Sequence, residues 1–204
     1  WVLGETLITG IGQGYIQSTP LQLCLMTAQI ANGGYSIKPK IIVDNNPISY
    51  EDAKQSMESQ LFFNKDAEFL EDKKLFKNER NIKIIQEAMF SSTNEQYGTS
   101  YKSRIDDPKY QFAGKTGTAQ VKRISKRERE LDLELEQIPY KDRDHALYVA
   151  YGPYTNPRYA LSIIIEHGGS GSKAAAPIAK ELFKLIIDRH ELRNKQSNFE
   201  RIKI

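Results

Sequence analysis

The chain has 204 residues, of which 39% are hydrophobic and 27% are charged, a composition typical of a folded domain and not of a disordered segment. No apolar run approaches the ~20 residues that a membrane-spanning helix needs, so we expect no such helix within these residues. The net charge of +3, from 29 basic and 26 acidic residues, is too balanced to indicate a nucleic-acid partner.

Cysteine and histidine are too sparse for disulfide or metal chemistry. Cys24 is the single cysteine, which excludes a disulfide within the chain, and its apolar neighbours favour a buried, unreactive side chain. The three histidines form no HExxH motif and no pair at i, i+4. We therefore expect neither a metal site nor a cofactor.

The first predicted element is a mostly buried helix that begins at Ser18-Thr19-Pro20, where a hydroxyl cap precedes a proline in the first turn. Asn32-Gly33-Gly34 ends this helix, because glycine readily adopts the left-handed conformation of a C-cap. Residues 35–43 then predict a β-branched strand, and Pro39 places it at a sheet edge.

Residues 44–81 are dominated by alternating charges with scattered phenylalanines, which indicates a variable, peripheral insertion. Ile82, Ile85 and Met89 then recur at helical spacing and predict a helix that faces the core. A polar run at residues 91–94 is expected to stop it.

Three strands are predicted in the second half of the chain, over residues 111–121, 146–151 and 159–167. The prolines and Asn of residues 153–157 mark a tight turn between the last two strands, which predicts an antiparallel hairpin. The charged residues 122–144 between the first two strands predict a solvated excursion, with Ser125 as a helix cap.

The last predicted helix follows the glycine-rich turn at residues 168–171 and would lie across the hairpin. Its predicted buried face consists of Ile178, Leu182, Leu185 and Ile186. Residues 196–204 predict a frayed tail. Together these elements predict an α+β fold with helices packed on an antiparallel sheet.

The strongest chemical signal is Lys115-Thr116-Gly117-Thr118 on the first strand of that sheet. Gly117 leaves a gap where the backbone of a ligand can approach, and Lys115 supplies a positive charge beside it. The hydroxyls of Thr116 and Thr118 can donate to a carboxylate, and the Thr118 N–H can point at a developing oxyanion. The combination indicates a site for an anionic acyl compound.

Two nucleotide-binding interpretations are excluded by spacing. Gly114-Lys115-Thr116 matches the last three residues of a phosphate-binding loop, but that motif also needs a glycine at position 109, which is Lys109 here. Gly10-Ile11-Gly12-Gln13-Gly14 has the wrong spacing for a dinucleotide fingerprint and lacks a surrounding parallel βαβ unit, so we interpret it as a tight loop.

Lys115-Thr116-Gly117 resembles the third motif of penicillin-binding proteins and serine β-lactamases, whose full set is Ser-x-x-Lys, Ser-x-Asn and Lys-Thr-Gly. Flanking segments are similar to class B penicillin-binding proteins of the cell-elongation type: residues 12–14, 19–23, 31–34, 98–100, 143–146, 150–154, 156–157 and 166–169. The resemblance covers nearly all of residues 1–204 and is weakest in the insertion at 44–81.

The resemblance implies the C-terminal portion of a peptidoglycan D,D-transpeptidase domain, in which a serine attacks the D-Ala-D-Ala bond of a stem peptide and β-lactams mimic that donor. Lys115 would set the electrostatic potential of the cleft, Thr116 and Thr118 would hold the substrate carboxylate, and Gly117 would keep the strand open. The Thr118 N–H would complete the oxyanion hole. A single-pass anchor upstream, a place at the periplasmic face of the inner membrane and a membrane glycosyltransferase partner are also implied.

In the family the Ser-x-x-Lys and Ser-x-Asn motifs precede the segment at residues 12–14, so both are expected upstream of Trp1. Ser170–Lys173 and Ser92–Asn94 match these motifs in spelling, but their order along the chain is wrong, and we expect neither to be functional. The chain by itself is therefore predicted to form no acyl-enzyme.

Two alternatives remain open. A non-catalytic module that binds peptidoglycan or a protein would also lack a nucleophile, although it would have no need for the glycine and hydroxyl pattern of residues 115–118. A piece of a β-lactamase is disfavoured by the length of chain before Lys115 and by the charged excursion after it.

Overall fold

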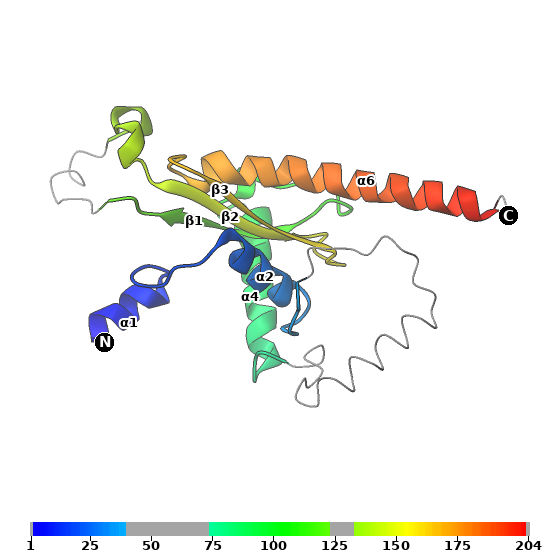
Figure 1. The fold of residues 1–204 in the computed structure, drawn as a ribbon, viewed down its shortest axis with the longest axis horizontal. Helices are drawn as coiled ribbons and strands as arrows, with labels where there is room; N and C mark the ends of the chain where they lie inside the picture. The colour runs from blue at the N-terminus through cyan, green and yellow to red at the C-terminus, as the bar shows by residue number, and fades with distance from the viewer. Residues whose placement is uncertain (1, 40–73, 123–132, 203–204) are drawn as a thin grey trace, which may run out of the picture.

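A computed structural model describes residues 2–39, 74–122 and 133–202. Its centre is a three-stranded antiparallel sheet in the order β1-β2-β3 (Figure 1). The strands are β1 (Ala113–Ala119), β2 (His145–Gly152) and β3 (Tyr159–Ile165). The predicted sheet and hairpin are confirmed, and β1 is shorter by two residues at each end than the predicted strand at 111–121.

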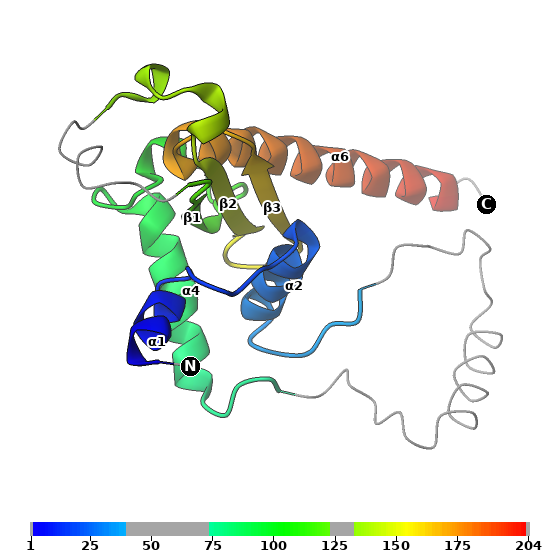
Figure 2. The same cartoon turned by 60° about the vertical axis from the view of Figure 1, so that its left-hand side comes forward.

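Helices lie on both faces of this sheet, as Figure 2 shows for α2 and α6. The α-helices of the described residues are α1 (Leu3–Gly10), α2 (Pro20–Ala31), α4 (Glu79–Asn94) and α6 (Ala176–Ile202). Single turns also occur: η2 (Tyr101–Ser103), η3 (Leu135–Gln137), η4 (Tyr140–Asp142) and the π-helical η5 (Gly171–Ala175). The α+β fold predicted from the sequence is confirmed.

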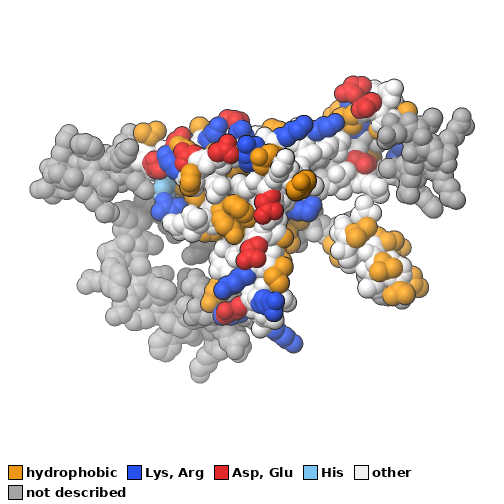
Figure 3. Space-filling model, turned by 180° about the vertical axis from the view of Figure 1, so that it is seen from behind, with side chains coloured by type: hydrophobic (Ala, Val, Ile, Leu, Met, Phe, Trp, Pro, Cys, Tyr) orange, Lys and Arg blue, Asp and Glu red, His pale blue; other side chains and the backbone are white. Residues whose placement is uncertain are grey.

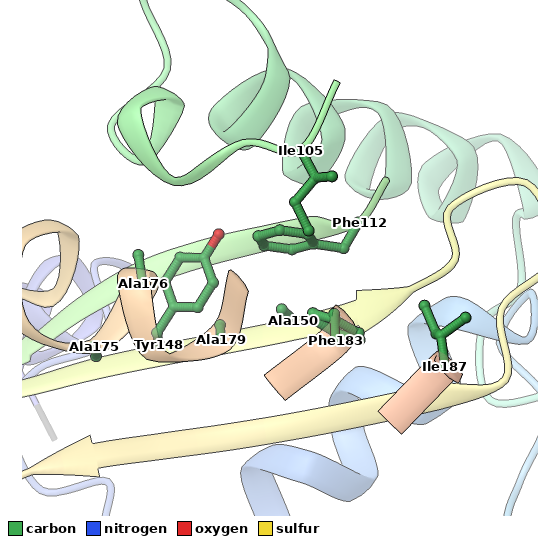
Figure 4. Close-up of a cluster of buried hydrophobic side chains, with 9 residues drawn as sticks. All are labelled: Ile105, Phe112, Tyr148, Ala150, Ala175, Ala176, Ala179, Phe183 and Ile187. Atoms are coloured by element: carbon green, nitrogen blue, oxygen red, sulfur yellow. The ribbon is translucent and has the colours of Figure 1, made fainter. Parts of the chain in front are cut away.

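One face of the sheet is closed by α6 and η5 in a cluster that we call the α6 core (Figure 4). Phe112 and Phe183 stack with ring centroids 4.8 Å apart, and Tyr148 meets Phe112 edge to face. The α6 core consists of Ile105, Phe112, Tyr148, Ala150, Ala175, Ala176, Ala179, Phe183 and Ile187. This is the larger of the two buried clusters found among the described residues.

The predicted buried face of the last helix is wrong. Ile178 and Leu185 are 41% and 64% exposed, whereas Ala179, Phe183 and Ile187 point into the α6 core. Alanines at the contact let the helix approach the sheet closely, and their weak hydropathy conceals this face from a pattern of large apolar residues. The helix also continues to Ile202, across most of the segment 196–204 predicted as a frayed tail.

On the opposite face, which we call the α2–α4 face, the packing is looser. Its buried residues are Ile30, Met89, Ala113 and Tyr151. The start of α2 is as predicted, because the Gln22 N–H donates to Thr19 Oγ1 over 3.2 Å. The prediction that this helix is mostly buried is wrong, since Thr27 and Ile30 are its only buried residues.

Cys24 is half-buried on the same helix. Its Sγ donates to the Ala160 carbonyl over 3.4 Å, and burial raises the pKa of the thiol. Both observations agree with the unreactive side chain expected from the sequence.

The segment after α2 departs from the predicted strand over residues 35–43. Tyr35 forms only an isolated bridge with Lys74, and residues 36–39 have no regular secondary structure. Residues 40–43 and most of the predicted insertion at 44–81 lie outside the described residues. The end of that segment belongs to α4, which begins at Glu79.

The polar run at residues 91–94 does not stop α4 but forms its last turn. Thr93 Oγ1 donates to the Met89 carbonyl over 3.4 Å, and Asn94 Nδ2 donates to the Phe90 carbonyl over 3.0 Å. Polar side chains that bond back to the preceding turn are compatible with a helix, which explains why this prediction was wrong. Of the excursion at 122–144, Ser125 lies outside the described residues, and the described part contains η3 and η4.

Helix α1 lies apart from the buried clusters. None of its residues is buried, and Leu3 and Leu7 are 78% and 67% exposed. Figure 3 shows the hydrophobic side chains of this helix standing clear of the body of the molecule. In the part of the chain that the structure describes, no helix is long and apolar enough to cross a membrane.

Candidate active site

The predicted site residues lie on β1, which forms the edge of the sheet. Strand β1 pairs with β2 on one side, and no other described strand pairs with its second edge. Lys115 and Thr118 are exposed, whereas Thr116 and Gly117 are half-buried. An unpaired edge presents N–H and C=O groups to which an extended peptide can add.

Lys115 and Thr116 are brought together although neighbouring side chains of a strand point to opposite faces. Their register partners show the alternation, because Lys115 lies opposite Val149 and Thr116 lies opposite Tyr148. Lys115 Nζ turns back and donates to the Thr116 carbonyl over 2.8 Å, and it lies 3.5 Å from Thr116 Oγ1. The positive charge and the hydroxyl therefore share the same side of the strand edge.

The two glycines of β1 have different structural roles. A Cβ on Gly114 would lie 2.3 Å from the Tyr148 hydroxyl, so internal packing requires this glycine. A Cβ on Gly117 would meet only Leu147 Cβ, at 3.4 Å, which is ordinary contact. Packing within the described residues thus gives no reason for glycine at position 117, whereas the approach of a ligand does.

The turn before α6 supports Gly117 from behind. A Cβ on Gly171 would lie 2.3 Å from the Leu147 carbonyl oxygen and 2.8 Å from that of Gly117. The match to Ser-x-x-Lys at Ser170–Lys173 falls on this turn, where Ser170 and Ser172 share a hydrogen bond of 3.0 Å. This segment, which begins η5, packs closely against β1 and β2.

A chain of hydroxyl groups that the sequence did not reveal reaches Thr116. Thr99 Oγ1 lies 3.2 Å from Ser92 Oγ and 3.2 Å from Thr116 Oγ1. In the sequence, Gly98-Thr99-Ser100 carries only a resemblance to the family, and Ser92 only a chance match to Ser-x-Asn. The contact joins residues 17 apart in sequence, a separation over which no periodicity carries a signal.

A second, buried group of hydroxyls lies beneath the first. The Tyr148 hydroxyl is 2.9 Å from Thr93 Oγ1 and 3.0 Å from Ser100 Oγ, and Thr93 and Ser100 are 3.3 Å apart. Burial raises the pKa of Tyr148, which keeps its hydroxyl protonated and able to donate. The end of α4 and residues 98–100 are thereby fastened to β2 behind β1.

A hollow of about 620 Å³ opens beside Lys115 on the α2–α4 face. Its wall is mainly apolar, with hydroxyls and Lys115 at one end: Met26, Ile30, Ile84, Ile85, Ala88, Met89, Ser91, Ser92, Glu95, Tyr97, Gly98, Thr99, Lys115 and Val149. Among the described residues no group of three or more His, Cys, Asp or Glu side chains could hold a metal ion. The polar groups that line the hollow are thus hydroxyls, the Lys115 ammonium and the Glu95 carboxylate.

Comparison with known proteins shows the family of the chain. The family model described as Penicillin binding protein transpeptidase domain matches residues 1–184. Relatives named peptidoglycan D,D-transpeptidase MrdA are 30% identical over 194 residues in Haemophilus influenzae and 31% identical over 182 residues in Acinetobacter baumannii. These alignments cover 93% and 87% of this chain but only 27% and 24% of the relatives.

Solved structures give the same result. PBP2 of Pseudomonas aeruginosa, in complex with WCK 5153, is 33% identical with a TM-score of 0.64, and the match covers 91% of this chain and 34% of that one. PBP2 of Helicobacter pylori is 29% identical with a TM-score of 0.60, over 91% and 27% of the two chains. With its edge strand, its fold and a family match over most of its length, the chain belongs to the penicillin-binding-protein transpeptidase domain family, and its relatives are of the PBP2 type.

Proposed function

We propose that the protein containing this chain is a peptidoglycan D,D-transpeptidase of cell-wall synthesis and cell elongation, and that β1 binds its acyl donor. The observation that carries the proposal is the edge of β1 that no other described strand pairs with. There Lys115 Nζ and Thr116 Oγ1 lie 3.5 Å apart, next to Gly117, which packing among the described residues does not require. The family membership supports it. The chain spans about a quarter of the length of its curated relatives.

In this proposal the donor is a stem peptide that ends in D-Ala-D-Ala. Its terminal carboxylate would be held by the Lys115 ammonium and by the hydroxyls of Thr116 and Thr118. Its peptide backbone would extend along the free edge of β1, with Gly117 leaving room for it. A β-lactam would occupy the same place, because it also carries a carboxylate beside a reactive acyl carbon.

The reaction proceeds through an acyl-enzyme. A serine oxygen forms a bond to the carbonyl carbon, the C–N bond to the terminal residue breaks, and D-alanine leaves with the transferred proton. The amine of a neighbouring stem peptide then takes the acyl group and restores the serine. The Thr118 N–H would stabilise the oxyanion in both steps, a contribution of about 3 to 4 kcal/mol for a donor of this kind.

The nucleophilic serine would come from residues outside 1–204, as would a single membrane anchor that holds the domain at the periplasmic face of the inner membrane. A membrane glycosyltransferase is the partner we propose, because it would supply the glycan strands that the reaction links. A structure of Helicobacter pylori PBP2 is a complex with MreC, so a relative of this chain has a protein partner.

Intact-mass spectrometry with benzylpenicillin tests the proposal. We expect the complete protein to gain the mass of one penicillin and the 204-residue chain alone to gain none, since it supplies the donor-binding strand without the nucleophile. A complete protein that gains no mass would point instead to a non-catalytic binding module. An adduct on the isolated chain would place the nucleophile within residues 1–204.

A further inference from the structure

The contacts of Thr99 suggest that a residue outside β1 controls the carboxylate-binding hydroxyl. Thr99 Oγ1 bridges Ser92 Oγ and Thr116 Oγ1, at 3.2 Å from each. Lys115 Nζ approaches the same Thr116 oxygen at 3.5 Å. Thr116 Oγ1 is therefore contacted by an ammonium group, which can only donate, and by a hydroxyl, which can donate or accept.

Counting protons leaves two possible directions for these hydrogen bonds, and they differ in what Thr116 can offer a ligand. A hydroxyl carries one proton, so Thr99 can donate to only one of its two neighbours. If Thr116 donated to Thr99, its proton would be unavailable to a substrate carboxylate. If Ser92 donates to Thr99 and Thr99 donates to Thr116, the oxygen of Thr116 accepts from Thr99 and Lys115 and its proton is free to point outward.

The residues on both sides of Thr99 are held against the end of α4, which fixes the backbone from which its hydroxyl projects. A Cβ on Gly98 would lie 2.3 Å from the Ser92 carbonyl oxygen, which shows how closely this turn approaches the end of α4. The Ser100 N–H and Ser100 Oγ both lie 3.0 Å from the same oxygen, to which they donate. Ser100 is 1% exposed.

We propose that Thr99 is a positioning residue that fixes Thr116 as a hydrogen-bond donor toward the carboxylate of the acyl donor. This inference rests on the proposed function and adds a residue from the α4–η2 turn to the site. It predicts that the Thr99 hydroxyl contributes only when the ligand carries a carboxylate. A general role in folding would have no such dependence on the ligand.

The test compares acylation of the complete protein by benzylpenicillin and by its methyl ester, in which the carboxylate charge is removed. Thr99→Val keeps the shape but removes the hydroxyl, and Thr99→Ser retains the hydroxyl. We expect Thr99→Val to lower the second-order acylation constant for benzylpenicillin about fivefold, the worth of one hydrogen bond. The constant for the ester should not change, and Thr99→Ser should restore the wild-type value.

Thr155→Val is the matched control, because Thr155 is exposed in the β2–β3 turn and touches none of these groups. In a Thr116→Val background, the change at position 99 should have no further effect on benzylpenicillin. Equal losses with both probes, or no loss with either, would overturn the positioning role; if Thr99→Val does not fold, Thr99→Ala gives the same comparison. A wild-type protein that neither probe acylates would overturn the proposed function and this role with it.

Discussion

The two faces of the sheet differ in how completely they are covered. In the α6 core, Phe112, Tyr148 and Phe183 are fully buried. On the α2–α4 face, the side chains of Met26 and Ile84, which line the hollow beside Lys115, are 44% and 52% exposed. The closed face carries most of the packing, and the open face leaves the edge of β1 accessible.

This difference explains how a strand with two glycines keeps a defined position. Glycine inside a strand contributes no side chain and costs conformational entropy. The α6 core, the Tyr148 hydroxyl cluster and the contact of Gly171 with Gly117 hold β1 from behind. The candidate edge can therefore stay open while its back is held by packing, which predicts different consequences for substitutions on the two faces.

The largest effect on stability should come from the closed face. Phe183→Ala removes a fully buried ring that stacks on Phe112, and we expect it to lower the free energy of unfolding by about 3 to 5 kcal/mol. Leu185→Ala, two positions along the same helix and 64% exposed, should cost less than about 0.5 kcal/mol. Equal losses in denaturant unfolding would contradict the assignment of the buried face of α6.

The open edge should show the reverse pattern, with a large effect on reaction and a small one on stability. Lys115→Ala removes the exposed cation next to Thr116, and we expect acylation by benzylpenicillin to fall by about 100-fold in the complete protein. Its thermal midpoint should stay near that of the wild type. Lys141→Ala, an exposed lysine on η4, is the control that should leave acylation unchanged.

The two glycines of β1 separate packing from ligand access on a single strand. Gly114→Ala should lower the free energy of unfolding by about 1 to 3 kcal/mol, because its methyl would overlap the Tyr148 ring. Gly117→Ala should leave stability nearly unchanged and slow acylation, because its methyl would occupy the space for the donor. A Gly117→Ala protein that is acylated at the wild-type rate would remove the argument for a ligand there.

The smallest expected effects come from two buried tyrosines. Tyr148→Phe should cost about 1 to 2 kcal/mol, because it leaves the Thr93 and Ser100 hydroxyls without their partner. The Tyr151 hydroxyl has no hydrogen-bond partner within the described residues and burial raises its pKa, so Tyr151→Phe should be neutral or slightly stabilising. Chemical unfolding of both variants measures the difference, and a larger loss for Tyr151→Phe would refute it.

Local patterns predicted the elements that carry strong local signals. The Thr19-Pro20 cap, the helical spacing of Ile82 and Met89, and the turn residues 153–157 of the hairpin all correspond to observed elements. The same is true of the placement of residues 115–118 on an accessible strand. These features depend on neighbours within one or two turns, so the chain itself specifies them.

Predictions failed where a distant segment decides the outcome. The buried face of α6 combines Ala176 and Ala179 with Phe183 and Ile187, because the sheet lies close to the helix there, whereas Ile178 and Leu185 stay exposed. Residues 91–94 continue α4 because Thr93 and Asn94 bond back to the preceding turn, and Asn94 Nδ2 also donates to the distant Phe112 carbonyl. No pattern among neighbouring residues predicts the close approach of the sheet to α6 or the hydrogen bond from Asn94 to Phe112.

The sequence by itself predicted the strand and marked it as a candidate site, because its lysine, hydroxyls and glycines are residue types that an ordinary strand avoids. Only the tertiary structure decided which glycine is needed for packing, that Lys115 turns toward Thr116, and that Ser92 and Thr99 complete the surroundings of that hydroxyl. The physical reason is that hydrogen bonds and steric contacts act over a few ångströms in space, whatever the separation along the chain.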